Sequence, residues 1–254
     1  MNTSLLHNKK ILITRPEPQS EILAQKLVED GAIPIVIPLI EIKPIAEWGE
    51  TDKIIHDIDE YDYLIFTSAN AVFYFMQRAN FLQVEIQGLK IVAVGNATKK
   101  KLEKYNLRVD LIPEKSYSKE IINVLGNDLK GKKILFPCAD IARKELRNLL
   151  IKAGALLSVV IVYENVFKEL NSNELRRINS LDFELVTLFS PSAAGALCEA
   201  LNPENIKRIN LVCIGETTYK SVVNKGFRSV FVAQTQSAEG IIEELKNIFS
   251  HNLA

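Results

Sequence analysis

The chain has 254 residues, enough for one large or two medium domains with buried cores, and 47% of its residues are hydrophobic. Its 31 basic and 31 acidic residues cancel, so no net charge favours nucleic acid or a membrane surface as a partner. No apolar stretch approaches the roughly 20 residues that cross a bilayer, and residues 1–10 lack the apolar core of a signal peptide. We therefore expect a cytoplasmic protein with no membrane or nucleic-acid partner.

Cysteines and histidines are few and scattered. The chain has three of each, at Cys138, Cys198, Cys213, His7, His56 and His251. An odd number of unclustered cysteines predicts neither a disulfide framework nor a thiolate metal site, so we expect buried or half-buried free thiols. A zinc or iron site and a serine or cysteine triad each need a well-placed histidine, so we expect none of these.

Short β-branched runs alternate with helical periodicity along the chain. The predicted strands of the first half are KILIT (10–14), PIVIPLI (34–40), YLIFTS (63–68), IVAVG (91–95) and RVDLIP (108–113). The predicted helices end at Gly31, Asn106, Gly154 and Gly226, residue types that tolerate a left-handed backbone. Alternating strands and helices predict a mainly parallel sheet that is covered on both faces.

The second half of the chain repeats the first. Residues 10–36 align without gaps on the segment that starts at Lys133. Residues 63–72 fall on 185–195 and residues 91–125 fall on 211–245, at nearly the same offset. Three blocks with one offset indicate an internal duplication. Two halves of about 120 residues predict two doubly wound α/β domains.

Six turns join a predicted strand to the helix that follows it. They are residues 14–18, 67–71, 95–98, 137–145, 190–194 and 215–218. Ligands of open α/β sheets bind at this edge, where helix N-termini offer backbone N–H groups to anions. Serine and threonine also cap helices there, so each turn is predicted to cap a helix, to bind a ligand or to do both. Neither G-x-x-x-x-G-K-[ST] nor G-x-G-x-x-G occurs, which argues against a nucleotide or dinucleotide cofactor.

Seven segments, in this order and spacing, carry a resemblance to a known family. They are ILITRPEPQ (11–19), LIFTSANAV (64–72), VAVGNAT (92–98), ILFPCADIARKEL (134–146), VVIVYENV (159–166), LFSPSAAGAL (188–197) and CIGETTYKSV (213–222). Over nearly its whole length the chain resembles the uroporphyrinogen-III synthase family of tetrapyrrole and haem synthesis.

The resemblance implies a particular route of the chain. The family has two flavodoxin-like, doubly wound parallel-sheet domains joined by a two-stranded linker. We expect a discontinuous first domain and an inserted second domain. The implied bounds are 1–39 with 167–254 for the first domain, 42–165 for the second, and crossings near 38–42 and 161–167.

The resemblance also implies a reaction. The family closes hydroxymethylbilane, a linear tetrapyrrole with eight carboxylates, into uroporphyrinogen III. Water leaves the terminal hydroxymethyl carbon to give a reactive azafulvene, and the macrocycle then closes with ring D inverted. This implies a cyclising hydro-lyase that needs no cofactor or metal and acts as a monomer. Positioning and helix N-termini could select the product and bind such an anion without net positive charge.

Site residues follow from the same resemblance. Tyr163 would assist departure of the hydroxyl, or it is a linker tyrosine packed against a domain edge. Thr218 matches a family threonine that is important for activity, and Thr217 or Thr218 is also expected to cap the following helix. The expected substrate-binding residues are Arg15, Thr67, Ser68, Ala69, Gly95, Asn96, Thr98, Ser190, Ser192, Gly215 and Thr217, with Arg143 as a weaker candidate.

Other functions are compatible with two α/β domains. A clamp-like protein that binds an anionic small molecule would have the same architecture, but such proteins usually carry an export signal or a DNA-binding module. The sequence shows neither. A cytoplasmic scaffold would leave the hydroxyl-rich turns unexplained, and a glycosyltransferase would need sugar-nucleotide binding, for which no motif is present. The sequence therefore favours the synthase.

Overall fold

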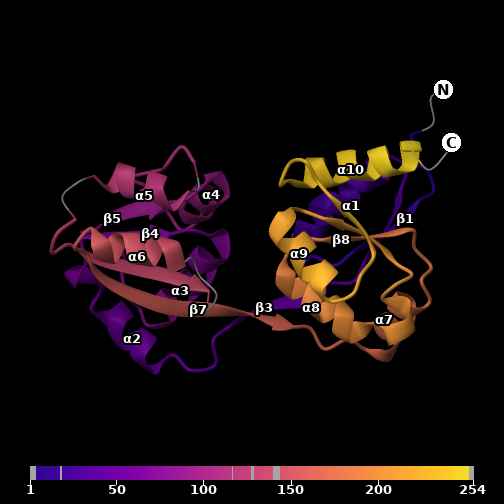
Figure 1. Ribbon diagram of the computed structural model, residues 1–254. Coiled ribbons are helices and arrows are strands. Elements are labelled where there is room, and N and C mark those ends of the chain that lie inside the picture. The colour runs from indigo at the N-terminus through magenta and orange to yellow at the C-terminus, as the bar shows by residue number, and fades with distance from the viewer. Residues whose placement is uncertain (1–3, 18, 116, 127–128, 140–143, 252–254) are drawn as a thin grey trace. The chain divides into compact units, whose positions relative to one another are not determined.

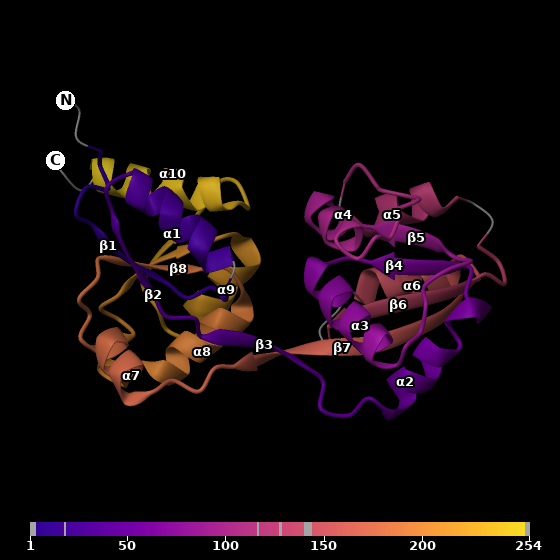
Figure 2. The same ribbon diagram turned by 180° about the vertical axis from the view of Figure 1, so that it is seen from behind.

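The computed structural model describes residues 4–17, 19–115, 117–126, 129–139 and 144–251. The chain forms two compact units: unit 1 comprises Met1–Glu41 and Val166–Ala254, and unit 2 comprises Ile42–Asn165. It therefore passes from one unit to the other twice. Each unit has a central sheet with helices on both faces (Figures 1 and 2). The α/β fold predicted from the sequence is confirmed.

Unit 1 contains a five-stranded parallel sheet in the order β10-β9-β8-β1-β2. Its strands are β1 (Lys10–Ile13), β2 (Ile33–Val36), β8 (Leu185–Leu188), β9 (Asn210–Cys213) and β10 (Ser229–Val232). One face is covered by α1 (Gln19–Glu29) and α10 (Ala238–His251), as Figure 1 shows. The other face is covered by α7 (Ser172–Asn179), α8 (Pro191–Ala200) and α9 (Glu216–Asn224), with the short 3-10 helix η2 (Pro203–Asn205) following α8. This strand order is flavodoxin-like.

Strand β1 shows why the sheet lies inside the unit. Ile11 and Ile13 belong to the core beneath α1 and α10, and Leu12 between them belongs to the core beneath α8 and α9. All three side chains are fully buried. Side chains of a strand point alternately to the two faces, so a strand covered on both faces must be apolar throughout.

Unit 2 contains a sheet in the order β3-β7-β6-β4-β5. Its strands are β3 (Ile40–Pro44), β4 (Tyr63–Phe66), β5 (Lys90–Ala93), β6 (Lys133–Ala139) and β7 (Leu156–Phe167). Helices α2 (Gly49–His56), α3 (Ala69–Phe81) and α4 (Asn96–Glu103), with the 3-10 helix η1 (Ile58–Glu60), cover one face. Helices α5 (Ser118–Leu125) and α6 (Lys144–Lys152) cover the other face, as Figure 2 shows from behind.

The two sheets repeat one plan. In unit 1 Lys10 pairs with Ile33, and at the equivalent place in unit 2 Lys133 pairs with Leu156. Each sheet nevertheless mixes strands from the two halves of the chain. Unit 1 takes β1 and β2 from the first half and β8 to β10 from the second, whereas unit 2 takes β3, β4 and β5 from the first half and β6 and β7 from the second. The N-terminal β-α-β segments of the two repeats are thus exchanged.

Two of the predicted strands differ from the structure. The run 34–40 is divided between β2 and β3 around Pro38, because proline has no N–H to donate to a strand ladder. The predicted strand at 108–113 forms only an isolated parallel bridge, between Val92 and Leu111. Within that run, exposed charged residues alternate with half-buried apolar ones, and the run ends in a proline. It therefore pairs with the edge strand of the sheet at a single position.

The predicted helix ends are confirmed. The φ angles of Gly31, Gly154 and Gly226 are 76°, 83° and 91°, and that of Asn106 is 59°. All four follow a helix in the left-handed conformation, which glycine adopts without strain and asparagine tolerates. These residues fix where the chain leaves each helix and turns towards the next strand.

Candidate functional site

The predicted site residues lie at one edge of each sheet. In unit 1 they follow β1, β8 and β9, and in unit 2 they follow β4 and β5 or lie in β7 beside the last residue of β6. Carboxyl ends of parallel strands share one edge of a sheet, so the residues of each unit gather there. We call Arg15, Ser190, Ser192, Gly215, Thr217 and Thr218 the unit 1 edge. We call Thr67, Ser68, Ala69, Gly95, Asn96, Thr98 and Tyr163 the unit 2 edge.

Two residues of the unit 2 edge contact each other through their hydroxyl groups. Ser68 Oγ lies 3.2 Å from Tyr163 Oη. Ser68 is also the N-cap of α3, and its Oγ accepts a hydrogen bond from Ala71 N at 3.1 Å. The Tyr163 side chain is buried, with 8% of its surface exposed. The helix cap therefore holds the serine hydroxyl in place next to the phenol.

Tyr74 of α3 belongs to the same arrangement, although the sequence does not predict it. Its ring stacks on that of Tyr163, with 5.7 Å between the centroids and 23° between the planes. Its hydroxyl donates to the backbone oxygen of Ile42 at 2.6 Å. Helical periodicity indicates only a partly buried position beside the fully buried Phe75. The stacking contact depends on β7, which lies far away in the sequence.

The remaining residues of the unit 2 edge differ in exposure. Thr67 and Ala69, on either side of the capping serine, are half-buried. Gly95 is the N-cap of α4 and has a left-handed φ of 85°. In the first turn of that helix Asn96 is exposed, whereas Thr98 is 3% exposed and packs against the unit. The structure thus brings all five to one edge but leaves Thr98 little contact with solvent.

At the unit 1 edge the capping serine has a different partner. Ser190 is the N-cap of α8, and its Oγ accepts from Ala193 N at 3.1 Å. The same oxygen lies 2.9 Å from Ser192 Oγ. Both serines are half-buried. The pair offers two hydroxyl groups at the start of one helix.

Arg15 is held beside these serines by its neighbours. Its Nε donates to Gln19 Oε1 at 2.7 Å, and its Cζ lies 4.6 Å from the centroid of the Phe189 ring. Burial lowers the pKa of the Arg15 guanidinium from its ordinary value, but an arginine remains charged at neutral pH. Within the part of the chain that the structure describes, no acidic side chain pairs with it. A half-buried guanidinium of this kind is suited to bind a carboxylate from outside.

The prediction that Thr217 or Thr218 caps α9 is wrong. The helix begins at Glu216, and its N-cap is Gly215, which has no side chain to donate or accept. Thr218 N already donates to Gly215 O at 3.1 Å, so the threonine lies inside the first turn. Thr217 is exposed and Thr218 is 3% exposed. The two hydroxyl groups lie two and three residues after the cap position, which a glycine fills.

The weaker candidate Arg143 lies outside the described residues. Within the described ranges, no group of three or more His, Cys, Asp and Glu residues could hold a metal ion. No helix among these residues is both long and apolar enough to cross a membrane. The three cysteines are buried or half-buried thiols outside any disulfide, as predicted, and burial raises the pKa of Cys213 to about 12. Because the thiolate is the reactive form, Cys213 is not a nucleophile at neutral pH.

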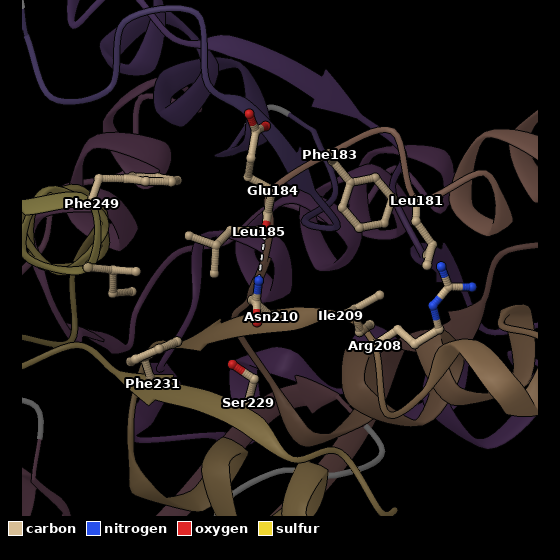
Figure 3. Close-up of a pocket in the computed structure, with 11 residues that line it drawn as sticks. Leu181, Phe183, Glu184, Leu185, Arg208, Ile209, Asn210, Ser229, Phe231 and Phe249 are labelled. Atoms are coloured by element: carbon tan, nitrogen blue, oxygen red, sulfur yellow. Dashed lines mark hydrogen bonds between the residues drawn. The ribbon is translucent and has the colours of Figure 1, made fainter. Parts of the chain in front are cut away.

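A cavity of about 550 Å³ opens at the opposite edge of the unit 1 sheet, where β8, β9 and β10 begin (Figure 3). Phe183, Phe231 and Phe249 line it together with polar side chains. Among these, Asn210 donates from Nδ2 to the backbone oxygen of Glu184 at 3.2 Å. None of the predicted site residues lines this cavity.

The model of one protein family, described as uroporphyrinogen-III synthase HemD, matches residues 21–243. The chain belongs to this family. Members of the family are enzymes of tetrapyrrole synthesis. The resemblance stated from the sequence motifs is therefore confirmed.

Relatives and solved structures agree with this assignment. The uroporphyrinogen-III synthase of Chlorobaculum parvum is 24% identical, and the match covers 94% of this chain and all of that one. The porphyrin biosynthesis protein HemD of Ruminiclostridium josui is 27% identical over 98% of this chain, but this chain spans only half of its length. The structure of the Helicobacter pylori uroporphyrinogen-III synthetase superimposes with a TM-score of 0.63 at 20% identity, covering 97% of this chain and 100% of that one. At this identity the structural likeness shows the fold alone.

Proposed function

We propose that this chain closes hydroxymethylbilane into uroporphyrinogen III with inversion of ring D. The family match over residues 21–243 carries the proposal, and relatives such as the Chlorobaculum parvum protein bear the name of that activity. The contact between Ser68 and Tyr163 supports the chemistry, because it places a phenol next to a fixed hydroxyl at the ligand-binding edge of a sheet.

In the proposed mechanism Tyr163 helps the substrate hydroxyl to leave. Ser68 Oγ already accepts the Ala71 N–H, so its own O–H can donate to the phenol oxygen. In this proposal the phenol gives its proton to the departing hydroxyl. The C–O bond at the terminal hydroxymethyl carbon breaks, the hydroxyl leaves as water, and the pyrrole nitrogen loses its proton to give the azafulvene. Proton donation of this kind contributes to the rate when the donor is positioned.

Binding of the carboxylates would rest on the two edges. We propose that Arg15, the hydroxyl group of Thr218 and the backbone N–H groups at the starts of α3, α4, α8 and α9 hold acetate and propionate groups. The enzyme would then be a cyclising hydro-lyase that needs no cofactor and acts as a monomer. Its selectivity for isomer III would come from positioning of the substrate, because an unassisted bilane closes without inversion.

A coupled assay tests the activity. Hydroxymethylbilane is generated freshly in the presence of the purified chain, and the uroporphyrin isomers are separated after oxidation. We expect isomer III in proportion to the protein added. Isomer I alone, at the spontaneous rate, would exclude the synthase, and the clamp-like binding protein would then be the function to test.

Thr218 offers a sharper test of the site. Thr218→Val keeps the volume of this buried side chain and removes its hydroxyl, whereas Thr218→Ser keeps the hydroxyl. Because Gly215 and not Thr218 caps α9, the valine variant should fold normally and still lose at least tenfold in kcat/KM, a loss of the size of one hydrogen bond to a charged group. Equal activity of the valine and wild-type proteins would remove Thr218 from the site. The serine variant should retain most of the activity.

A further inference from the structure

The internal duplication places Cys138 of unit 2 where Arg15 stands in unit 1. Lys10 and Lys133 begin the corresponding strands β1 and β6, and each pairs with the corresponding residue of the next strand. Position 15 and position 138 are equally far along these strands. Unit 2 therefore has a thiol at the place where unit 1 has its guanidinium.

A guanidinium reaches this place in unit 2 from a helix instead. Arg147 of α6 donates from Nη2 to Cys138 Sγ at 3.3 Å. Its side chain is half-buried, and its Nε is buried without a hydrogen-bond acceptor. Buried N–H groups almost always have an acceptor, and a thiol is a weak one. The guanidinium is thus poorly satisfied by the protein itself.

No carboxylate of the described residues compensates this charge. Glu145, on the same helix, accepts a hydrogen bond from Ser118 Oγ at 2.9 Å. Within the described ranges Arg147 forms no ion pair with any acidic side chain. Arg15 in unit 1 shares this property, since its neighbours are an amide and a phenyl ring. Two arginines on different elements, Arg15 and Arg147, therefore supply positive charge at equivalent corners of the two sheets, and neither is paired with an acidic side chain of the described residues.

We propose that Arg147 binds a carboxylate of the tetrapyrrole at the unit 2 edge, as the counterpart of Arg15 at the unit 1 edge. This inference rests on the proposed function. A carboxylate presents two oxygens in one plane, which match two parallel N–H groups of a guanidinium and are stronger acceptors than a thiol. The ligand would replace the contact with Cys138.

Binding of uroporphyrin III tests the inference without relying on turnover. This stable porphyrin keeps the eight carboxylates, and its fluorescence anisotropy reports binding to the full chain. Arg147→Gln retains part of the side-chain stem and an amide donor but loses the charge. We expect it to bind uroporphyrin III about tenfold more weakly than the wild type, and Arg147→Lys to lie between the two.

Two control variants make the result specific. Arg108→Gln removes the same charge from an exposed side chain of the same unit. Arg108 precedes Leu111, which pairs with β5 in parallel, so it lies towards the edge of the sheet opposite the unit 2 edge. Cys138→Ala removes the thiol, including its contact with Arg147. Both should bind within twofold of the wild type. If Cys138→Ala weakens binding as much as Arg147→Gln, Arg147 acts by supporting the strand and the proposal is overturned.

The outcomes separate this inference from the proposed function. Wild-type affinity in Arg147→Gln, with isomer III still produced by the wild type, would overturn the inference and leave the function intact. A wild-type chain that neither binds uroporphyrin III nor forms isomer III would overturn both. Thermal unfolding of each variant is measured alongside. If Arg147→Gln does not fold, Arg147→Lys takes its place in the binding test. Wild-type affinity of Arg147→Lys for uroporphyrin III, at high and low salt alike, would count against the inference.

Discussion

Ser68 and Ser190 occupy the same place in the two units, each as the N-cap of the helix that follows a buried strand. Each accepts from the N–H of an alanine three residues later, at 3.1 Å in both units. Their second contacts differ, since Ser68 meets the phenol of Tyr163 and Ser190 meets the hydroxyl of Ser192. The shared contact explains why both copies keep a serine, and the second contact distinguishes what each edge can do.

The largest expected effect concerns the phenol of Tyr163, which contacts Ser68, whereas Ser190 contacts Ser192. Tyr163→Phe should fold normally and lower kcat on the order of 10²-fold, because it removes the proposed proton donor and leaves the ring stacked on Tyr74. Isomer III formation measures the effect. The matched control is Tyr61→Phe, which removes a hydrogen bond to Ser158 in the same unit and should leave kcat unchanged. Equal losses in both variants would mean that stability and not chemistry is affected.

The serine pair tests the comparison directly. Ser68→Ala and Ser190→Ala each remove one N-cap, so each should lower the free energy of unfolding by about 1 kcal/mol. Only Ser68→Ala should also lower kcat, by about tenfold, because Tyr163 loses the hydroxyl that orients it. Urea unfolding and the isomer assay together measure both quantities. Equal kcat losses in the two variants would show that the tyrosine contact has no special role.

The two capping glycines predict a smaller difference. Gly95 has a left-handed φ of 85°, so Gly95→Ala should destabilise the protein by about 1 kcal/mol through backbone strain. Gly215 is extended, and an added Cβ there would meet only the end of the exposed Gln236 side chain, at 2.9 Å. Gly215→Ala should therefore cost less than about 0.5 kcal/mol. Urea unfolding of both variants checks the order, and the reverse order would contradict the backbone argument.

A similarly small effect is expected at the other edge of the sheets, where Asp62 of unit 2 and Glu184 of unit 1 correspond. Asp62 accepts from Lys133 N at 2.9 Å, as Glu184 accepts from Lys10 N at 2.7 Å. A hydrogen bond from Lys132, then the one from Lys133 N, lower the pKa of Asp62. A carboxyl group whose pKa is lower in the folded protein stabilises the fold at pH values above its ordinary pKa, near 3.8. This stabilisation disappears as the pH falls through the lowered pKa.

Asp62→Asn should therefore destabilise the protein by less than about 1 kcal/mol at pH 7, since the ion pair is partly exposed. The difference from the wild type should shrink below pH 4, as the pH falls through the lowered pKa of Asp62. Unfolding in urea at pH 7, 4 and 2 measures it. A difference that stays constant over this range would show that the charge of Asp62 is not involved.

Local sequence patterns predict much of this fold. Buried strands such as β1 are continuous apolar runs, and Gly31 and Asn106 mark helix ends through backbone conformations that few residues adopt. The two wrongly predicted strands are segments in which a single residue or the exposure of its neighbours outweighs the apolar composition. Pro38 divides a run that is apolar throughout, and Leu111 pairs at one position only because its neighbours remain exposed.

The candidate site is only partly visible in the sequence. Hydroxyl residues after strands predict the edges, and two of the serines do cap helices. The stacking of Tyr74 on Tyr163 joins residues whose proximity depends on strand order, which periodicity does not encode. Arg147 and Cys138 lie on consecutive elements, but helical periodicity does not indicate which side chain of α6 reaches the strand before it. Capping by Thr217 or Thr218 was the natural prediction, and it fails because Gly215 takes the cap position with its backbone alone.

The exchange of segments between the repeats has a consequence for synthesis on the ribosome. Strand β1 lies between β2 and β8, and Ile11 pairs with Leu185. The ribosome synthesises β8 only after the whole of unit 2. At a synthesis rate of 5–20 residues per second, β1 is therefore exposed for roughly 10–30 s before β8 is available to pair with it. Meanwhile unit 2 is already complete, and the apolar side chains of β1 and α1 depend on chaperones or on transient contacts for protection from aggregation.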